Sequence, residues 1–272
     1  DWSLRTNESW SHSMAGDVSI HWGDHTWEEI EQLADTRALA VLPCGATEQH
    51  GPALLLKTDT RIAERVAWSA AEKVWREHGV RALVLPTLAY GVSPHHMGFA
   101  GTISLEAETY IALVSDVLRS VVKHGFRKIA VMSGHGGNIP ALDVACRKVA
   151  DEWAHRPVRI VLDRMAEVPP WFAEILATAP KEGGITGHAD MIETSLMLAD
   201  MPDSIRRDRI SRPHLKVESP PEWAWLTHEL TATGALGDPT LASSDLGEKV
   251  WQGAVNDFAE RLLRLSRLVL PD

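Results

Sequence analysis

The chain has 272 residues, enough to bury a hydrophobic core in one large α/β domain or two small ones. Its composition, 44% hydrophobic and 24% charged, is ordinary for a globular protein. The formal net charge of -10 argues against nucleic acid or an anionic membrane as a partner, because proteins that bind either usually carry a basic patch.

The cysteines and the hydropathy pattern indicate a cytoplasmic protein. Cys44 and Cys146 are the only cysteines, and their spacing matches neither a disulfide framework nor a zinc knuckle. We find no secretory leader and no apolar run of membrane-spanning length. We therefore expect a protein with no membrane partner.

Apolar strand-like runs alternate with helical patterns along most of the chain. Strands are predicted at residues 38–43, 81–86, 127–133 and 158–163. Helices are predicted at residues 26–33, from 59 through 74, and at 106–124. Further helices are predicted from the end of the glycine-rich segment 134–138 to about residue 153, and at 171–178, 189–199 and 244–268. This alternation predicts an α/β fold whose mostly parallel sheet is covered by helices on both faces.

The remaining segments are predicted to be irregular. Residues 1–24 are polar and are expected to form an arm, and residues 212–245 carry several prolines and are expected to form loops. No stretch has the composition of a linker. We therefore expect residues 1–272 to form a single domain.

A candidate metal-binding stretch follows the first predicted strand. Glu48 and His50 come soon after residues 38–43, and Asp59 opens the next helix. Carboxylate oxygens and imidazole nitrogens are ligands for zinc, manganese and iron. A carboxylate such as Asp59 can also bridge two cations about 3.5 Å apart, as in two-metal hydrolytic sites.

Other polar side chains follow the next strands. His95 and His96 follow the second strand, and His135 follows the third within a glycine-rich turn. Ligands of parallel α/β sheets bind outside the carboxyl ends of the strands, so these groups are expected at one edge of the sheet. His188 and Glu193, from a later segment, are candidates to complete the site.

Each of these residues also has a purely structural interpretation. Asp59 could cap its helix, His135 could be a surface loop residue, and Glu193 could form a salt bridge. His95 fits packing or loop structure better than metal ligation. A coincidence of all these structural roles at one edge of the sheet is much less probable than any one of them.

Five segments in chain order resemble one known family. They are Gly45-Ala-Thr-Glu-Gln-His-Gly-Pro52 with Thr58-Asp59, Phe99-Ala-Gly-Thr-Ile-Ser-Leu105, Ser133-Gly-His-Gly-Gly-Asn138, Gly187-His-Ala with Glu193-Thr-Ser195, and Gly237-Asp-Pro. Together they resemble the creatininase (creatinine amidohydrolase) family. The resemblance implies a three-layer α/β/α sandwich, a site for two divalent ions, usually zinc or manganese, and a homo-oligomer such as a hexamer.

The resemblance also implies roles for individual residues. Glu48, Asp59 and His135 would bind one metal, and His50 would bind the second together with the bridging Asp59. His188 matches a catalytic histidine that lies near the substrate and shuttles a proton. We also expect His96 to contact the substrate.

One position departs from the creatininase pattern. Creatininases proper carry a glutamate two residues after the position of His135, where this chain has Gly137. Glu193 is the candidate replacement for that ligand; otherwise the second metal would bind weakly, or the site would work with one metal ion. The same Gly-His-Gly-Gly-Asn form occurs in pyrimidine deformylases, in the mycofactocin peptide peptidase and in hydrolases that open oxidised inositol rings, so creatinine itself is a doubtful substrate.

The sequence thus predicts a divalent-metal-dependent hydrolase that cleaves an amide or cyclic amide bond in a small polar molecule. A metal-bridged hydroxide would attack the carbonyl, and the Gly136 or Gly137 N–H would bind the developing oxyanion. His188 would donate a proton to the leaving group. Two alternatives stay open: ring-opening C–C hydrolysis of an oxidised inositol or sugar diketone, and a non-catalytic binding or regulatory module.

Overall fold

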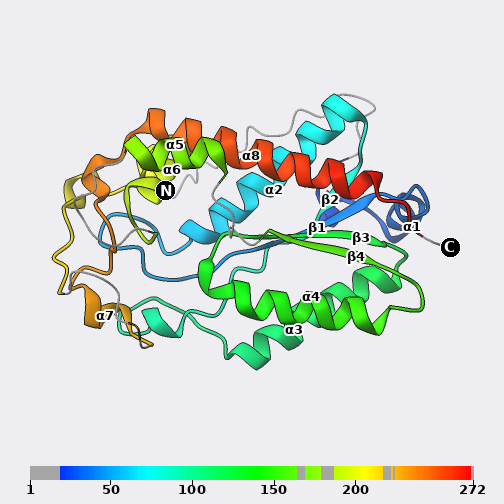
Figure 1. Ribbon diagram of the computed structural model, residues 1–272, viewed down its shortest axis with the longest axis horizontal. Coiled ribbons are helices and arrows are strands. Elements are labelled where there is room, and N and C mark those ends of the chain that lie inside the picture. Colours follow the sequence, from blue (N-terminus) through cyan, green and yellow to red (C-terminus); the bar gives the residue numbers. More distant parts are fainter. Residues whose placement is uncertain (1–18, 164–168, 179–186, 217–221, 223, 271–272) are drawn as a thin grey trace, which may run out of the picture.

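The core of the protein is a four-stranded, all-parallel sheet with the strand order β2-β1-β3-β4 (Figure 1). The computed structural model describes residues 19–163, 169–178, 187–216, 222 and 224–270. The strands are β1 (Leu39–Cys44), β2 (Ala82–Val84), β3 (Lys128–Ser133) and β4 (Arg159–Asp163).

Helices cover both faces of the sheet (Figure 1). They are α1 (Trp27–Asp35), α2 (Thr58–His78), α3 (Ala107–Lys123), α4 (Ile139–Glu152), α5 (Pro170–Thr178), α6 (Met191–Asp200), α7 (Thr227–Leu230) and α8 (Ser244–Arg267). One face carries α2, α6 and α8, and the other carries α1, α3 and α4. The expected α/β sandwich with a parallel sheet is therefore confirmed.

The alternation of side chains along the strands explains why both faces are covered. In β1, Leu39 and Val41 pack against α2 and α8, whereas Ala40 and Leu42 pack against α3 and α4. All six residues of β1 are buried, as expected for a central strand with apolar side chains on both faces. The continuous apolar run in the sequence thus corresponds to burial on both sides.

The predicted elements agree with the structure to within a few residues. Thr26 caps α1 in a capping box with Glu29, and α2 begins one residue before Asp59. Within the predicted loops at residues 212–245, the structure also contains the short helix α7. Of the predicted arm, residues 19–24 are described: the carbonyl oxygen of Ile20 accepts a hydrogen bond from the N–H of Val84 in β2, and residues 22–24 form a 3-10 helix.

Two glycines bring the start of α2 close to the strand ends. A Cβ atom on Gly45, after β1, would lie 2.4 Å from the Cα of Thr60. A Cβ atom on Gly134, after β3, would lie 2.2 Å from the carbonyl oxygen of Asp59. Since real Cβ contacts are never this short, only glycine allows this approach, which places Asp59 between the ends of β1 and β3.

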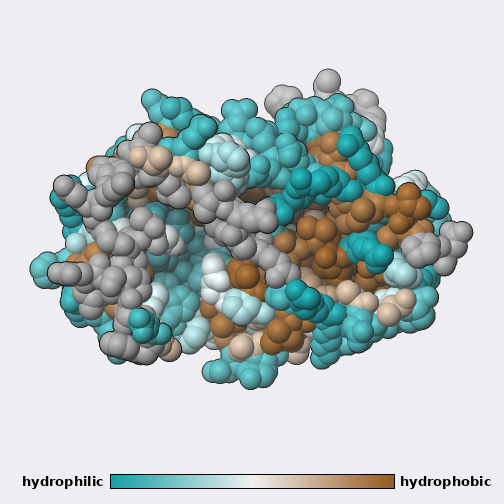
Figure 2. All heavy atoms as spheres, in the orientation of Figure 1, coloured by the Kyte–Doolittle hydropathy of each residue, from teal (hydrophilic) through white to brown (hydrophobic). Residues whose placement is uncertain are grey.

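The hydrophobic surface of the molecule agrees with the position of β4 in the sheet. Figure 2 shows hydrophobic residues gathered over the part of the molecule where β3 and β4 lie in Figure 1. This fits the position of β4 as an edge strand, in which Ile160 and Val161 are only half-buried.

Among the described residues, no helix combines the length and apolar character needed to cross a membrane.

Candidate active site

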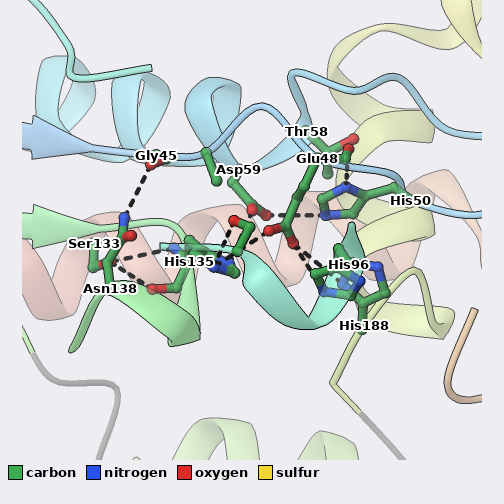
Figure 3. A network of polar contacts seen from close by, with 12 residues as sticks. Gly45, Glu48, His50, Thr58, Asp59, His96, Ser133, His135, Asn138 and His188 are labelled. Atoms are coloured by element: carbon green, nitrogen blue, oxygen red, sulfur yellow. Dashed lines mark hydrogen bonds and ion pairs between the residues drawn. The ribbon is translucent and has the colours of Figure 1, made fainter. Parts of the chain in front are cut away.

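A cluster of buried carboxylates and imidazoles lies at the carboxyl ends of the strands (Figure 3). It contains the residues that follow β1, β2 and β3, together with two residues at or near the start of α6. These are Glu48, His50, Asp59, His96, His135, His188 and Glu193. The structure thus brings together all the predicted metal-ligating and catalytic side chains, although they come from distant parts of the chain.

Asp59 lies between two imidazoles. Its Oδ1 is 3.0 Å from Nε2 of His50, and its Oδ2 is 3.2 Å from Nδ1 of His135. Each carboxylate oxygen therefore faces a different histidine. This is the arrangement that a carboxylate bridging two cations requires.

Main-chain carbonyl groups orient both of these imidazoles. Nδ1 of His50 lies 3.1 Å from the carbonyl oxygen of Glu48, and Nε2 of His135 lies 3.1 Å from that of Val92. A carbonyl oxygen only accepts, so these nitrogens carry the protons of the neutral rings. In the neutral rings that a metal requires, the lone pairs would be on His50 Nε2 and His135 Nδ1, the nitrogens that face Asp59, as for metal-ligating histidines held by outer hydrogen bonds.

The buried carboxylate oxygens fit a divalent cation. Glu48 is fully buried, yet among the described residues neither of its carboxylate oxygens has a hydrogen-bond partner, and the same holds for Oδ2 of Asp59. Their ion-pair contacts within the described chain are with histidines. Buried anions without such compensation are costly, and a bound cation supplies it.

Within the part of the chain that the structure describes, the geometry gives three groups of potential ligand atoms. Within each group the ligand atoms lie within 4.8 Å of one another. The groups are Glu48 with His50 and Asp59, Glu48 with His96 and His188, and His50 with His188 and Glu193. Carboxylate and imidazole donors of this kind suit zinc, manganese or iron.

Glu193 lies on the His50 side of the cluster. Its Oε2 is 3.5 Å from His50 Nε2 and accepts a hydrogen bond of 2.5 Å from the N–H of Ala189. Ala189 has a φ of 49°, a left-handed conformation that is uncommon for alanine. This position is compatible with the expected role of Glu193 as a replacement ligand.

Gly137 has no room for a side chain. A Cβ atom there would lie 2.4 Å from His135 Nε2 and 2.5 Å from the carbonyl oxygen of Val92. It would therefore intrude on the contact that orients His135. Gly136, in contrast, is exposed, and a Cβ atom there would meet nothing within 4 Å.

His96 and His188 both face Oε1 of Glu48. His96 Nε2 and His188 Nδ1 are 3.3 and 3.6 Å from Oε1 of Glu48, and the two rings stack with centroids 4.1 Å apart. His96 therefore contacts Glu48. Its expected contact with the substrate stays a prediction. His95 packs against His96, His135 and Trp225 through its ring.

The electrostatics divide the histidines into two kinds. Burial opposes a charge on His50 and His135, but Asp59 together with Glu48, and for His50 also Glu193, outweighs it and raises their pKa values to about 10 and about 9. Burial, followed by neighbouring histidine charges, lowers the pKa of His96 to about 2 and that of His188 well below its usual value. His96 and His188 are therefore neutral.

The carboxyl groups are perturbed in both directions. Burial, with repulsion from Asp59, raises the pKa of Glu48 to about 7, and burial raises that of Glu193 to about 8. Burial also opposes ionisation of Asp59, but the adjacent His50 and His135 hold its pKa well below the usual range. Asp59 is therefore the anionic centre of the cluster.

Gln49 and Asn138 are among the polar residues of the site that were not predicted from the sequence. Gln49 points its side-chain amide between His96 and His188. Asn138 accepts a hydrogen bond from the N–H of Val92 and donates one to the carbonyl oxygen of Gly45, each 2.9 Å long. Both lie within the quoted motifs, but their partners come from distant segments.

Comparison with known proteins identifies the family. The family model described as "Creatininase: Creatinine amidohydrolase" matches residues 23–262. The mycofactocin precursor peptide peptidase of Mycobacterium tuberculosis (strain CDC 1551 / Oshkosh) is 35% identical over 240 residues, which cover 86% of this chain and 88% of that protein. The creatinine amidohydrolase of Pseudomonas putida is 29% identical over 257 residues, which cover 90% and 96%.

Solved structures agree with this result. A structure named "Creatininase Mn" superposes with a TM-score of 0.80 at 26% identity, covering 92% of this chain and 100% of that one. A creatininase mutant of the Zn-Zn type gives a TM-score of 0.79 at 26% identity, covering 93% and 100%. The resemblance found in the sequence is confirmed, and the chain is a hydrolase of the creatininase family.

Proposed function

We propose that this protein is a divalent-metal-dependent hydrolase of amide bonds, acting on a small polar molecule or a peptide. The observation that carries the proposal is the cluster of Glu48, Asp59 and Glu193 around His50 and His135, in which buried carboxylate oxygens lack hydrogen-bond partners among the described residues. Both named relatives, a peptide peptidase and an amidohydrolase, support amide chemistry.

Five residues would hold the metal ions. We assign Glu48, Asp59 and His135 to one cation, and His50, Asp59 and Glu193 to the other, with Asp59 shared between them. When bound, the ions supply Lewis acidity that activates water and polarises the substrate carbonyl group. The names of the solved relatives favour manganese or zinc.

His188 would move the proton. Nε2 of His188 lies 2.8 Å from the carbonyl oxygen of Gln49, so the proton of the neutral ring is on Nε2 and Nδ1 has a free lone pair. Nδ1 faces the cluster near Glu48. We therefore assign His188 to accept a proton at Nδ1 first and then to donate it to the leaving amine, which refines the donor role predicted from the sequence.

The glycine turn after β3 would bind the developing oxyanion. Residues 136–138 form a 3-10 helix, and the first N–H groups of a helix have no partner within it. Gly136 is an exposed residue. We keep the N–H groups of Gly136 and Gly137 as the proposed oxyanion donors.

The test is an assay of protein loaded separately with zinc, manganese or iron against lactams, formamides, short peptides and oxidised inositols. We expect amide hydrolysis by at least one loaded form. Glu48→Gln, Asp59→Asn and His135→Ala should each abolish turnover and lower the metal content, whereas Glu260→Gln on the exposed face of α8 should change neither. Full activity of chelated, metal-free protein would exclude the proposal, and cleavage of oxidised inositols alone would favour the C–C hydrolase.

A further inference from the structure

The side chain of Gln49 is buried at the centre of the site and contacts two histidines. It is 5% exposed, and its Nε2 lies 2.8 Å from Nδ1 of His96 and 2.9 Å from Nε2 of His188. Gln49 itself neither titrates nor belongs to the proposed metal ligands. Its possible role is therefore to set the hydrogen-bonding roles of its neighbours.

Main-chain groups fix the orientation of the Gln49 amide. The N–H of Gly51, which only donates, lies 3.0 Å from Oε1. The carbonyl oxygen of Gly234, which only accepts, lies 3.1 Å from Nε2. Both contacts require the oxygen and nitrogen to be placed as they are, because exchanging them would set donor against donor and acceptor against acceptor.

This orientation determines the tautomer of His96. One amide hydrogen of Gln49 is donated to Gly234, and the second is directed at His96 Nδ1. Nδ1 of His96 therefore accepts, and the proton of the neutral ring is on Nε2, which faces Oε1 of Glu48 at 3.3 Å. The hydroxyl group of Thr227, 2.9 Å from Nδ1, can donate to the same nitrogen.

The contact with His188 has a different origin. His188 Nε2 lies 2.8 Å from the main-chain oxygen of Gln49, so this nitrogen carries a proton and cannot accept from the Gln49 amide. If His188 Nε2 instead accepted a hydrogen from the Gln49 amide, it could no longer donate to the carbonyl oxygen of Gln49. Both amide hydrogens would then be directed at the two histidines, and the bond to the carbonyl oxygen of Gly234 would be lost as well. The main chain of residue 49 thus sets His188, whereas its side chain sets His96.

We propose that Gln49 is a positioning residue whose side-chain amide holds His96 as the Nε2–H tautomer, so that an N–H group of His96, and not a lone pair, is on the side of the ring that faces Glu48. Nε2 of His96 lies 3.3 Å from Oε1 of Glu48, and Nε2 of His135 lies 3.3 Å from Oε2. This inference rests on the proposed function for its kinetic consequence. The hydrogen-bonding assignment itself does not depend on it.

The tautomers can be observed directly by nitrogen-15 NMR of zinc-loaded protein with labelled histidine, in which protonated and unprotonated ring nitrogens have different shifts. His96→Asn and His188→Asn variants assign the signals. We expect Nε2–H on both rings in the unmodified protein. In Gln49→Glu, which has nearly the same shape but donates nothing, the His96 proton should move to Nδ1, while His188 stays unchanged.

Gln49→Met provides a second variant without a buried charge, and a mixture of His96 tautomers is expected for it. Both variants should lower kcat by about 10- to 100-fold, as changes in outer partners of metal sites do, with KM largely unchanged. Gln252→Glu on the exposed surface of α8 is the matched control and should show neither effect.

Two results would overturn the inference. One is a His96 proton on Nδ1 in the unmodified protein, and the other is an unchanged His96 tautomer in both Gln49 variants. Absence of turnover on any amide in the unmodified protein would instead overturn the proposed function, and the NMR result would still decide the role of Gln49.

Discussion

The carboxylate of Glu193 lies 3.5 Å from Nε2 of His50. Because Glu193 is in the first turn of α6 and His50 follows β1, this contact joins two distant segments at the site. The resemblance to creatininases places the corresponding metal-binding glutamate in the turn after β3, at the position where this chain has Gly137. In the proposed ligand set, Glu193 supplies this carboxylate from α6, and the following prediction tests that assignment.

The first prediction concerns the number of bound cations. Glu193→Gln is expected to reduce the bound zinc from two ions to one, because the amide removes the anionic charge next to His50 but keeps the shape. Elemental analysis after dialysis measures the number directly. Glu260→Gln, on the exposed face of α8, is the matched control. Retention of two ions by Glu193→Gln would show that Glu193 is not a ligand.

The second prediction concerns the space at residue 137. Gly137→Ala is expected to lower the free energy of unfolding by about 1–3 kcal/mol and to weaken metal binding, because the new Cβ atom would press on His135 and on the main chain at Val92. Denaturant unfolding and a zinc titration measure the two effects. Gly23→Ala, where the Cβ atom meets nothing within 4 Å, is the control. Unchanged zinc affinity in Gly137→Ala would contradict the prediction.

The sequence was sufficient to predict the sheet and the site-bearing loops, because strands and helices have different hydrophobic periods. It also placed Glu48, Asp59 and His135 at one edge, since parallel strands end on the same side. It could not predict the contacts of Gln49 with His188 or of Asn138 with Val92. Those contacts depend on how separate loops fold over one another, and a single amide in the sequence gives no signal of its partners.

The third prediction concerns pH and metal removal. Burial opposes a charge on His50 and His135, but Asp59 raises their pKa values to about 10 and about 9 from the usual 6.5. A histidine with a raised pKa stabilises the folded state fully below pH 6.5 and loses that contribution as the pH rises through the folded value. The metal-free protein should therefore lose stability between about pH 6.5 and 10.

Bound zinc should remove most of this dependence, because the cation takes the place of the protons between the imidazoles and the carboxylates. The pKa of Asp59 is lowered, so the stability that its charge provides is lost only in acid, as the pH falls below the usual Asp value of 3.8. Denaturant unfolding at a series of pH values, with chelator and with saturating zinc, measures both curves. A chelated protein whose stability is constant from pH 6.5 to 10 would contradict the assignment.

The last prediction separates catalysis from metal ligation at His188. Its Nδ1 lone pair faces Glu48 at 3.6 Å, so the geometry alone is compatible with either role. If His188 moves the proton, His188→Asn should lower kcat by about 10²- to 10⁴-fold and leave the number of bound cations unchanged. If it is a ligand, the cation number or affinity should fall together with the activity.

The matched control is His155→Asn, which changes an exposed histidine that stacks on Trp153 far from the cluster in sequence. Metal content and kcat must be measured on the same preparations, because loss of metal would by itself abolish turnover. A His188→Asn protein with full metal content and undiminished kcat would exclude both roles. The proton would then have to reach the leaving amine from another group, and His95, which is half-buried beside His96 and His135, would be the next residue to test.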